Sequence, residues 1–233
     1  SAGIERLTHQ PLSFSVSETT EGVHIHIIDA ELMGKGEKEK KDLYIEGVQN
    51  NGIINHYEYI INSEGTIEIR HVLKPEGKMP LWFPRIGLTL TVSDALDQVK
   101  WYGRGPQENY PDRKTGYPTG IYASTVQAMY EPYLMPQDYG LRTDVRWLQL
   151  TTDKGIGLQF KINEWFNFNI YPYSTDNLTK AMYTYQLQKQ KGMTLNLDYA
   201  TTGVGCTARG VFGAYKAMPQ EYRRTISIKP MMK

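Results

Sequence analysis

The residues best suited to chemistry lie in one segment, which runs from Trp101 to Arg113. It reads Trp-Tyr-Gly-Arg-Gly-Pro-Gln-Glu-Asn-Tyr-Pro-Asp-Arg and holds two acids and two arginines. Its carboxylates, Glu108 and Asp112, could form the acid and base pair of a glycoside hydrolase, but the separation that such a pair needs is a three-dimensional property. Alternatively, Arg104 or Arg113 could hold either carboxylate in a bidentate ion pair. The residue types therefore leave open a loop that faces a ligand and a loop held together by its own hydrogen bonds.

The backbone of this segment is as unusual as its side chains. It follows a predicted strand at residues 98–102, and its glycines allow other groups to approach the main chain closely. Pro111 favours an extended conformation of Tyr110. If the loop faces a ligand, its polar and aromatic side chains are the candidate substrate-binding residues. They are Trp101, Arg104, Glu108, Asn109, Tyr110, Asp112 and Arg113.

Residues that bind metals or act as nucleophiles are sparse elsewhere in the sequence. His24 and His26 share one face of a predicted strand, but no third ligand is indicated nearby, so we predict no metal site. No Gly-x-Ser-x-Gly motif occurs, and no histidine follows His71. The single cysteine, Cys206, is expected to be a small buried apolar residue. The sequence thus offers little for catalysis outside the segment at 101–113.

Composition excludes several functional classes. With 26 Lys and Arg against 25 Asp and Glu, the formal net charge is +1, which argues against a nucleic-acid binder. A single cysteine excludes an internal disulfide, and no apolar stretch reaches the ~20 residues of a membrane span. The chain begins with Ser1 and shows no signal-peptide core. We therefore expect a soluble fragment whose compartment, cytoplasmic or periplasmic, stays open.

Alternation of apolar and polar residues predicts the elements that must position these side chains. A period of two is typical of β-strands, because successive side chains point to opposite faces of a sheet. Such runs recur at 12–16, 23–27, 67–69, 86–92, 156–162, 166–170, 195–199 and 226–228. Turn signals that tolerate positive φ separate them at 50–52, 62–65, 152–155 and 189–192. The predicted fold class is all-β and antiparallel.

One segment is typical of a helix, at residues 175–182. Ser174 precedes it as a plausible N-cap. Leu178, Ala181 and Met182 form its short apolar stripe. A helix of this length does not change the fold class.

No boundary between domains is visible in the sequence. A run of mixed charge at residues 34–41 is expected to be a solvated loop or a hairpin tip. Neither an internal repeat nor a low-complexity linker divides the chain. We therefore predict a single domain over residues 1–233, a length that can bury a sizeable core.

The segment at 101–113 resembles the signature of a known family. Its pattern, Trp-x-Gly-x-Gly-Pro-x-Glu-x-Tyr-x-Asp-Arg, is similar to that of the C-terminal domain of β-galactosidases of glycoside hydrolase family 2, a region also called the small chain. The resemblance continues in other segments along the chain. They are residues 84–87, 133–147, 172–175, 195–199 and 203–205. It thus covers essentially the whole sequence.

The resemblance implies a fold and a division of labour. The fold is a large antiparallel β-supersandwich similar to galactose mutarotase, with at most one or two short helices. In such enzymes the two catalytic glutamates of a retaining mechanism lie in a preceding (β/α)8 barrel, and the parent enzyme binds Mg²⁺ outside this domain. The resemblance therefore implies no catalytic residue, no metal site and no cofactor in this chain. It implies a domain that shapes the rim of the active site, meets the galactoside only indirectly, and supports assembly with the preceding domains in a parent that can be a homo-oligomer.

Two departures from the family pattern bear on these expectations. Family members begin this domain with a strand pair that the sequence lacks, so its first strands are expected to be missing. Some members follow Gly-x-Gly with Gly-Asp-Asp-Ser-Trp, whose Trp stacks on the substrate. Here residues 203–210 read Gly-Val-Gly-Cys-Thr-Ala-Arg-Gly, and Gly210 stands at the position of that Trp. The departure weakens the expectation of a direct role in substrate binding.

Two other classes of function stay open. A carbohydrate-binding module could use Trp101, Trp165 and tyrosines as stacking platforms. A sugar epimerase of the mutarotase type would need a histidine acid and a glutamate base, and the absence of histidine after His71 argues against it. We expect a β-galactosidase domain, itself non-catalytic, ahead of both.

Overall fold

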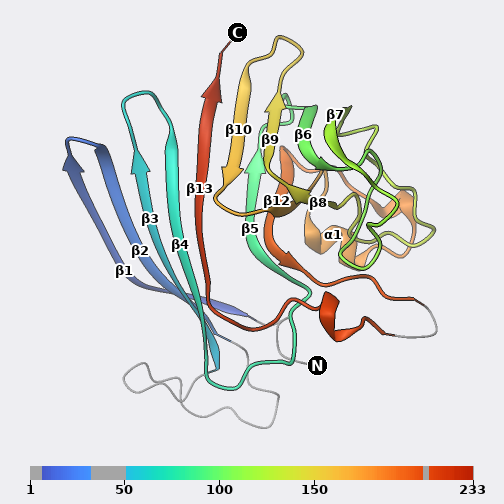
Figure 1. The fold of residues 1–233 in the computed structure, drawn as a ribbon, viewed down its shortest axis with the longest axis horizontal. Coiled ribbons are helices and arrows are strands. Elements are labelled where there is room, and N and C mark those ends of the chain that lie inside the picture. Colours follow the sequence, from blue (N-terminus) through green and yellow to red (C-terminus); the bar gives the residue numbers. More distant parts are fainter. Residues whose placement is uncertain (1–6, 33–50, 207–209, 233) are drawn as a thin grey trace. The chain divides into compact units, whose positions relative to one another are not determined.

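The computed structural model describes residues 7–32, 51–206 and 210–232. Strands dominate this part of the chain, and their pairings are antiparallel (Figure 1). The prediction of an all-β, antiparallel fold is confirmed. The chain divides into two compact units, residues 1–83 with 218–227 and residues 84–217 with 228–233. That residues 1–233 act as a single domain stays a prediction.

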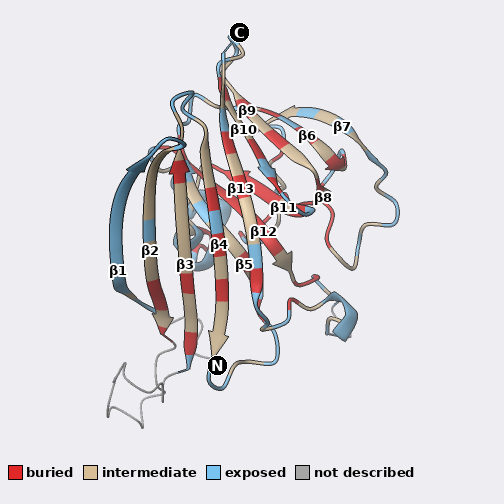
Figure 2. Cartoon of the chain, turned by 60° about the vertical axis from the view of Figure 1, so that its left-hand side comes forward, coloured by how far each residue is buried: buried red, intermediate tan, exposed pale blue. Residues whose placement is uncertain are grey.

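The first unit is built on a meander of long strands. They are β1 (Thr8–Thr19), β2 (Gly22–Leu32), β3 (Gly52–Ile61) and β4 (Ile67–Glu76), which lie in this order in the sheet. β13 (Tyr222–Met231) lies beside β4, and its residues up to Ser227 belong to this unit. β1 begins this order and is exposed along almost its whole length (Figure 2). The register places Glu58 of β3 directly opposite His26 of β2 and Arg70 of β4. Since opposite residues share a face, these three side chains lie in one row across the sheet.

The second unit contains two groups of paired strands. The first group, in sheet order, is β10 (Gly157–Ile162), β9 (Trp147–Thr151), β6 (Gln98–Arg104) and β7 (Thr119–Thr125). The second is β5 (Arg85–Val92), β12 (Met193–Thr201), β11 (Phe166–Tyr171) and β8 (Arg142–Val145). The ring of Trp101 on β6 meets that of Phe168 on β11 edge-on, with centroids 5.9 Å apart. The two groups therefore share an apolar core.

The core follows the predicted alternation. The fully buried apolar side chains include Trp101, Leu148, Leu150, Phe160, Phe168, Ile170, Leu195 and Leu197. Residues 193–199 of β12 are buried on both faces, which also encloses the polar residues between the leucines. Two 3-10 turns complete the unit, η2 (Thr184–Gln186) and η3 (Gly213–Tyr215).

The predicted helix forms as α1 (Thr175–Lys180) and is shorter than the predicted range, 175–182. The hydroxyl of Ser174 caps its N-terminus, as predicted. Leu178, a residue of this helix, is buried. Met182 is 55% exposed because the helix ends before it, so its place in the apolar stripe is wrong.

The turn signals differ in what they mark. Gly65 (φ 77°) and Gly155 (φ 78°) lie in tight reversals between β3 and β4 and between β9 and β10, as predicted. Gly192 (φ 82°) instead leads into β12. The partner of β12 is β11, and α1 lies between these two strands in the sequence, so this signal marks no tight hairpin. Gly52 begins β3. The charged run at 34–41 lies outside the described residues.

Candidate functional site

The segment with the strongest chemical signature leaves β6 as a folded loop in the second unit. A pair of backbone hydrogen bonds joins Tyr110 and Arg113, at 2.8 and 3.2 Å, and closes the loop on itself. The Gly105–Pro106 peptide is cis. Some side chains of the loop are buried in the protein, and others bond to neighbouring loops.

Glu108 is the best-bonded carboxylate of the loop. It is 6% exposed and accepts hydrogen bonds from the hydroxyls of Tyr110 (3.1 Å) and Tyr133. The guanidinium of Arg113 (2.8 Å) and the backbone N–H of Gly140 (2.9 Å) complete its partners. Burial alone would raise the pKa of Glu108, but these donors together lower it below its ordinary value. Glu108 is thus a fixed, ionised carboxylate, which is not the state of a general acid at neutral pH.

Asp112 reaches away from its own loop to a second one. Its two oxygens accept the backbone N–H groups of Val204 (3.0 Å) and Gly205 (2.7 Å). Neither arginine of the loop is its partner, so the alternative in which Arg104 or Arg113 holds Asp112 is wrong, because the side chain points toward the loop that follows β12. Beyond this contact Cys206 is exposed, so the expectation that it is buried is wrong. It lies past the end of the strand, where the core no longer covers it.

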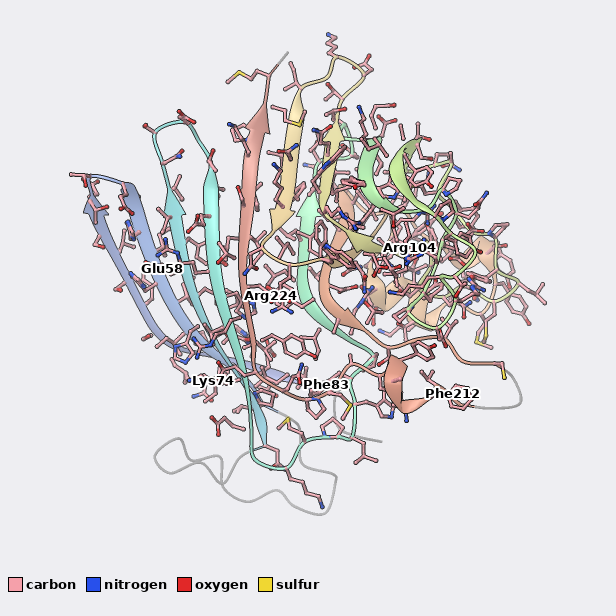
Figure 3. All side chains as sticks on the ribbon, viewed as in Figure 1. Glu58, Lys74, Phe83, Arg104, Phe212 and Arg224 are labelled. Atoms are coloured by element: carbon pink, nitrogen blue, oxygen red, sulfur yellow. The ribbon has the colours of Figure 1, made fainter. Side chains whose placement is uncertain are left out.

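Arg104 pairs with an acid that sequence reasoning did not single out, Asp144. Its Nε lies 2.5 Å from the Asp144 carboxylate, which Lys114 also contacts at 2.8 Å. Arg104 additionally donates to the backbone oxygens of Lys114 and Tyr117 at 3.1 and 2.9 Å. Burial raises the pKa of Asp144, but Lys114 and Arg104 outweigh it and lower the pKa overall. Figure 3 shows Arg104 amid the dense side chains of this unit.

Trp101 and Asn109 are structural in this arrangement. Both are 0% exposed. The indole of Trp101 packs in the core and donates to the oxygen of Arg104 at 3.0 Å. The side-chain oxygen of Asn109 accepts from the N–H (3.0 Å) and the hydroxyl (2.5 Å) of Thr143. The expectation that Trp101 stacks on a sugar, and that Asn109 contacts one, is corrected: both side chains are enclosed by protein.

A cavity of about 560 Å³ opens beside the loop. Tyr110 and Arg113 line it together with Tyr133, Arg85 and Asp138. Of the predicted site residues, the structure thus brings Tyr110 and Arg113 to a common cavity, with Glu108 bonded to both behind it. Aromatic rings, a cation and a carboxylate around a cavity of this size are groups that can bind a polar small molecule.

The strands beneath the cavity carry a buried polar network that sequence reasoning missed. Arg85 lies 2.9 Å from Asp198 and 3.4 Å from Asp138. Burial raises the pKa of Asp198 to about 6 in spite of the neighbouring guanidinium. Asn169 joins the network through a hydrogen bond from Asn196 at 2.8 Å. The signal was present in the sequence, as polar residues at every second position between buried leucines of β12, but an alternating polar face is ordinarily solvated.

Arg142 was also missed as a structural residue. It is 3% exposed, and it donates to the oxygens of Pro106 (3.0 Å) and Gly140 (2.9 Å) while lying over the ring of Trp101. Burial lowers its pKa to about 10. It therefore joins the loop after β6 to the loop before β8, in parallel with Glu108.

Groups that could hold a metal ion occur in the first unit. They are His24, His26 and Glu58. Among the described residues, no helix is both long enough and apolar enough to cross a bilayer.

Comparison with known proteins identifies a family and several relatives of this chain. The family model described as β-galactosidase small chain matches residues 9–228. A β-galactosidase of Priestia megaterium is 38% identical over 147 residues, which are 63% of this chain and 14% of that protein. A β-galactosidase of Vibrio cholerae is 39% identical over 122 residues, 52% of this chain and 11% of that protein. The matched part is thus a small share of the length of these relatives.

A comparison of structures finds a GalM/aldose epimerase homologue from C. elegans. The TM-score is 0.45 at 11% sequence identity, and the match covers 94% of this chain and 69% of the other.

Proposed function

The chain belongs to the β-galactosidase small chain family, and from this premise we propose that it is a non-catalytic domain of a β-galactosidase of glycoside hydrolase family 2. In this proposal the longer protein hydrolyses terminal β-D-galactosides. Its two catalytic glutamates and its Mg²⁺ site lie in a preceding barrel, which is the main partner of this domain. The match to only 14% and 11% of the length of two relatives supports the division.

One observation carries the non-catalytic role: the acids of the signature loop are committed to internal hydrogen bonds. Glu108 is buried, ionised and held by side-chain and backbone donors. Asp112 binds two main-chain N–H groups. A retaining glycosidase needs one carboxylic acid that can give a proton and one carboxylate free to attack carbon. Neither residue is free for these tasks.

The same contacts support a role in shaping a rim. Asp112 fixes residues 204 and 205, and the chain continues from them toward Gly210, where the family resemblance places a substrate-stacking Trp. Gly210 is exposed, and a Cβ at this position would meet no atom within 4 Å. In the proposed enzyme the position of Gly210 borders the active site, and the domain meets the galactoside indirectly.

The test uses the 233-residue chain and an aryl β-galactoside. We expect no turnover by the purified chain, whereas the longer protein that contains it turns over. Turnover by the purified chain would overturn the proposal, and its loss in Glu108→Gln or Asp112→Asn would assign the catalysis to the signature loop. In the longer protein, Asp112→Asn should lower kcat/KM with little change in thermal stability, and Asp153→Asn in an exposed turn is the matched control.

A second function, carbohydrate binding by the domain itself, is favoured by one exposed aromatic side chain. Trp165 is 60% exposed, and Arg146 lies over its ring at 4.4 Å. An exposed indole beside a cation is a platform on which a sugar ring can stack. Titration with galactose and lactose, followed by NMR, should shift the Trp165 indole signal and not that of buried Trp101. No shift up to tens of millimolar sugar would remove this function.

A further inference from the structure

His24 and His26 face a carboxylate that is distant in the sequence. Both lie on β2, two residues apart and therefore on one face of the sheet. Glu58 lies on β3 directly opposite His26, and it is labelled on this sheet in Figure 3. We propose that His24, His26 and Glu58 form a binding site for a divalent transition metal of the Zn²⁺ type.

The distances suit such a site. His24 Nδ1 lies 3.3 Å from Glu58 Oε1, and His26 Nε2 lies 3.9 Å from the same oxygen. One ligand atom from each of the three residues falls within 4.8 Å of the other two. In a tetrahedral Zn²⁺ site with bonds of ~2.0–2.1 Å, ligand atoms are ~3.3 Å apart. Side-chain rotations can close the difference, and the strands need not move.

A neighbouring arginine orients the carboxylate. Arg70 lies opposite Glu58 on β4, and its Nη1 donates to Glu58 Oε2 at 3.0 Å. The other oxygen, Oε1, is left facing the two histidines. Outer groups that bond the second oxygen of a metal-bound carboxylate fix its direction and support binding. The Nε of Arg70 also donates to Glu68 at 2.8 Å, and this second carboxylate offsets part of the positive charge of Arg70.

The donor set and its exposure favour Zn²⁺ over Mg²⁺ or Ca²⁺. Two imidazoles and one carboxylate are ligands of Zn²⁺ and similar ions, whereas the hard cations prefer oxygen alone. The His24 side chain is 12% exposed and that of Glu58 is 25% exposed, so two ligands are well placed by the sheet. The His26 side chain is 50% exposed and leaves an open approach for the ion and for a water molecule as fourth ligand.

The site would join two strands by a cross-link. β2 and β3 are neighbours whose connection is the stretch from residue 33 to residue 51. A metal bound by His24 and His26 on one strand and Glu58 on the other binds the folded arrangement better than the unfolded chain. Metal binding therefore stabilises the first unit.

Calorimetric titration of the 233-residue chain with ZnCl₂ tests the site. We expect one Zn²⁺ per chain in the micromolar range or tighter, a rise in Tm with Zn²⁺ and no such rise with Mg²⁺. Co²⁺ should give the intense visible absorption of a tetrahedral complex. His26→Ala and Glu58→Gln should each weaken Zn²⁺ binding at least tenfold, since each removes a ligand.

The matched control is His9→Ala. His9 also pairs with a glutamate of the first unit, Glu31 at 2.9 Å, but lacks a second histidine, so its loss should leave Zn²⁺ binding unchanged. Far-UV circular dichroism shows whether each variant is folded. His26→Ala is expected to disturb the fold less than Glu58→Gln, because the His26 side chain is the more exposed of the two. Binding weaker than about 1 mM, or equal binding by the wild type and folded His26→Ala, would overturn the proposal.

Discussion

The carboxylate of Glu108 accepts the backbone N–H of Gly140 at 2.9 Å, across 32 positions of sequence. Gly140 has a positive φ of 76°, a conformation that glycine adopts at little cost. The bond joins the signature loop to the loop that precedes β8. Arg142 joins the same two loops by donating to the backbone oxygens of Pro106 and Gly140. The two loops are therefore held together by both Glu108 and Arg142.

Glu108→Gln should destabilise the chain at pH 7 by about 2–4 kcal/mol, because the amide cannot accept from all four donors and leaves Arg113 without its carboxylate. The pKa of Glu108 is lowered in the folded state, so its stabilisation is full above the ordinary value of 4.5. It is lost as the pH falls below that value. Urea unfolding should therefore show a constant gap between wild type and variant from pH 8 to 5 and a smaller gap below 4.5.

The control for this change is Glu64→Gln, at an exposed turn position. It should leave stability within about 0.5 kcal/mol of the wild type at every pH. If the stability difference between the wild type and Glu108→Gln widened in acid, the pKa of Glu108 would not be lowered in the folded state.

Asp112→Asn should loosen the loop after β12 without unfolding the domain. The amide keeps one acceptor oxygen, so one of the two N–H groups, of Val204 or Gly205, loses its partner. Amide hydrogen exchange at these two positions should become about tenfold faster, as expected for the loss of one hydrogen bond to a charged group. Mass spectrometry of the peptide that covers them measures this change. Equal exchange rates in both proteins would show that the carboxylate does not anchor the loop.

Gly203→Ala should cost about 1–3 kcal/mol of unfolding free energy. A Cβ on Gly203 would overlap the carboxylate of Asp112, which must move and give up its hydrogen bonds. Gly116→Ala is the matched control, because a Cβ there meets no atom within 4 Å. In an Asp112→Ala background the overlap is gone, so Gly203→Ala should then cost almost nothing. An undiminished cost in that background would point to another cause.

His71 should make the first unit sensitive to mild acid. It is 1% exposed, stacks on Tyr57 at 4.2 Å, and contacts Asn55 at 3.1 Å. Burial, aided by the charge of His56, lowers its pKa from 6.5 to about 4. The unfolded chain takes up a proton in this window and the folded chain does not. Stability is therefore full above pH 6.5 and falls by about 3 kcal/mol as the pH drops to 4.

His71→Gln tests this dependence by urea unfolding at several pH values. The variant should be less stable at pH 7.5, and its stability should fall less between pH 6.5 and 4. His9→Gln is a control of opposite sign, because the hydrogen bond to Glu31 raises the pKa of exposed His9. An unchanged slope in His71→Gln would assign the acid sensitivity to other groups.

The strands could be predicted because a period of two is a local property of the sequence. Partner choice could not, since it depends on contacts between distant segments. Arg113 pairs with Glu108, five positions away, and this was among the predicted alternatives. Arg104 instead pairs with Asp144, forty positions away, whose backbone has a positive φ of 55°. Nothing near Arg104 in the sequence indicates that contact.

Burial and long-range pairing explain the other differences. Trp101 belongs to an alternating strand, but alternation alone does not say which of its faces the second group of strands covers. The third residue of the His24 and His26 group, Glu58, lies 34 positions from His24. It becomes visible only when the register of β2 and β3 is known.

The anchoring of residues 204 and 205 by Asp112 has an evolutionary consequence. The carboxylate binds main-chain N–H groups, which every residue type except proline possesses. Of residues 204 and 205, only Gly205, with a φ of 66°, is constrained by backbone geometry. The side chain at residue 204 can therefore diverge while the attachment is inherited unchanged, whereas a Cβ at Gly203 would displace the Asp112 carboxylate. Such an anchor lets descendants of one domain differ at this position without having to evolve a new scaffold.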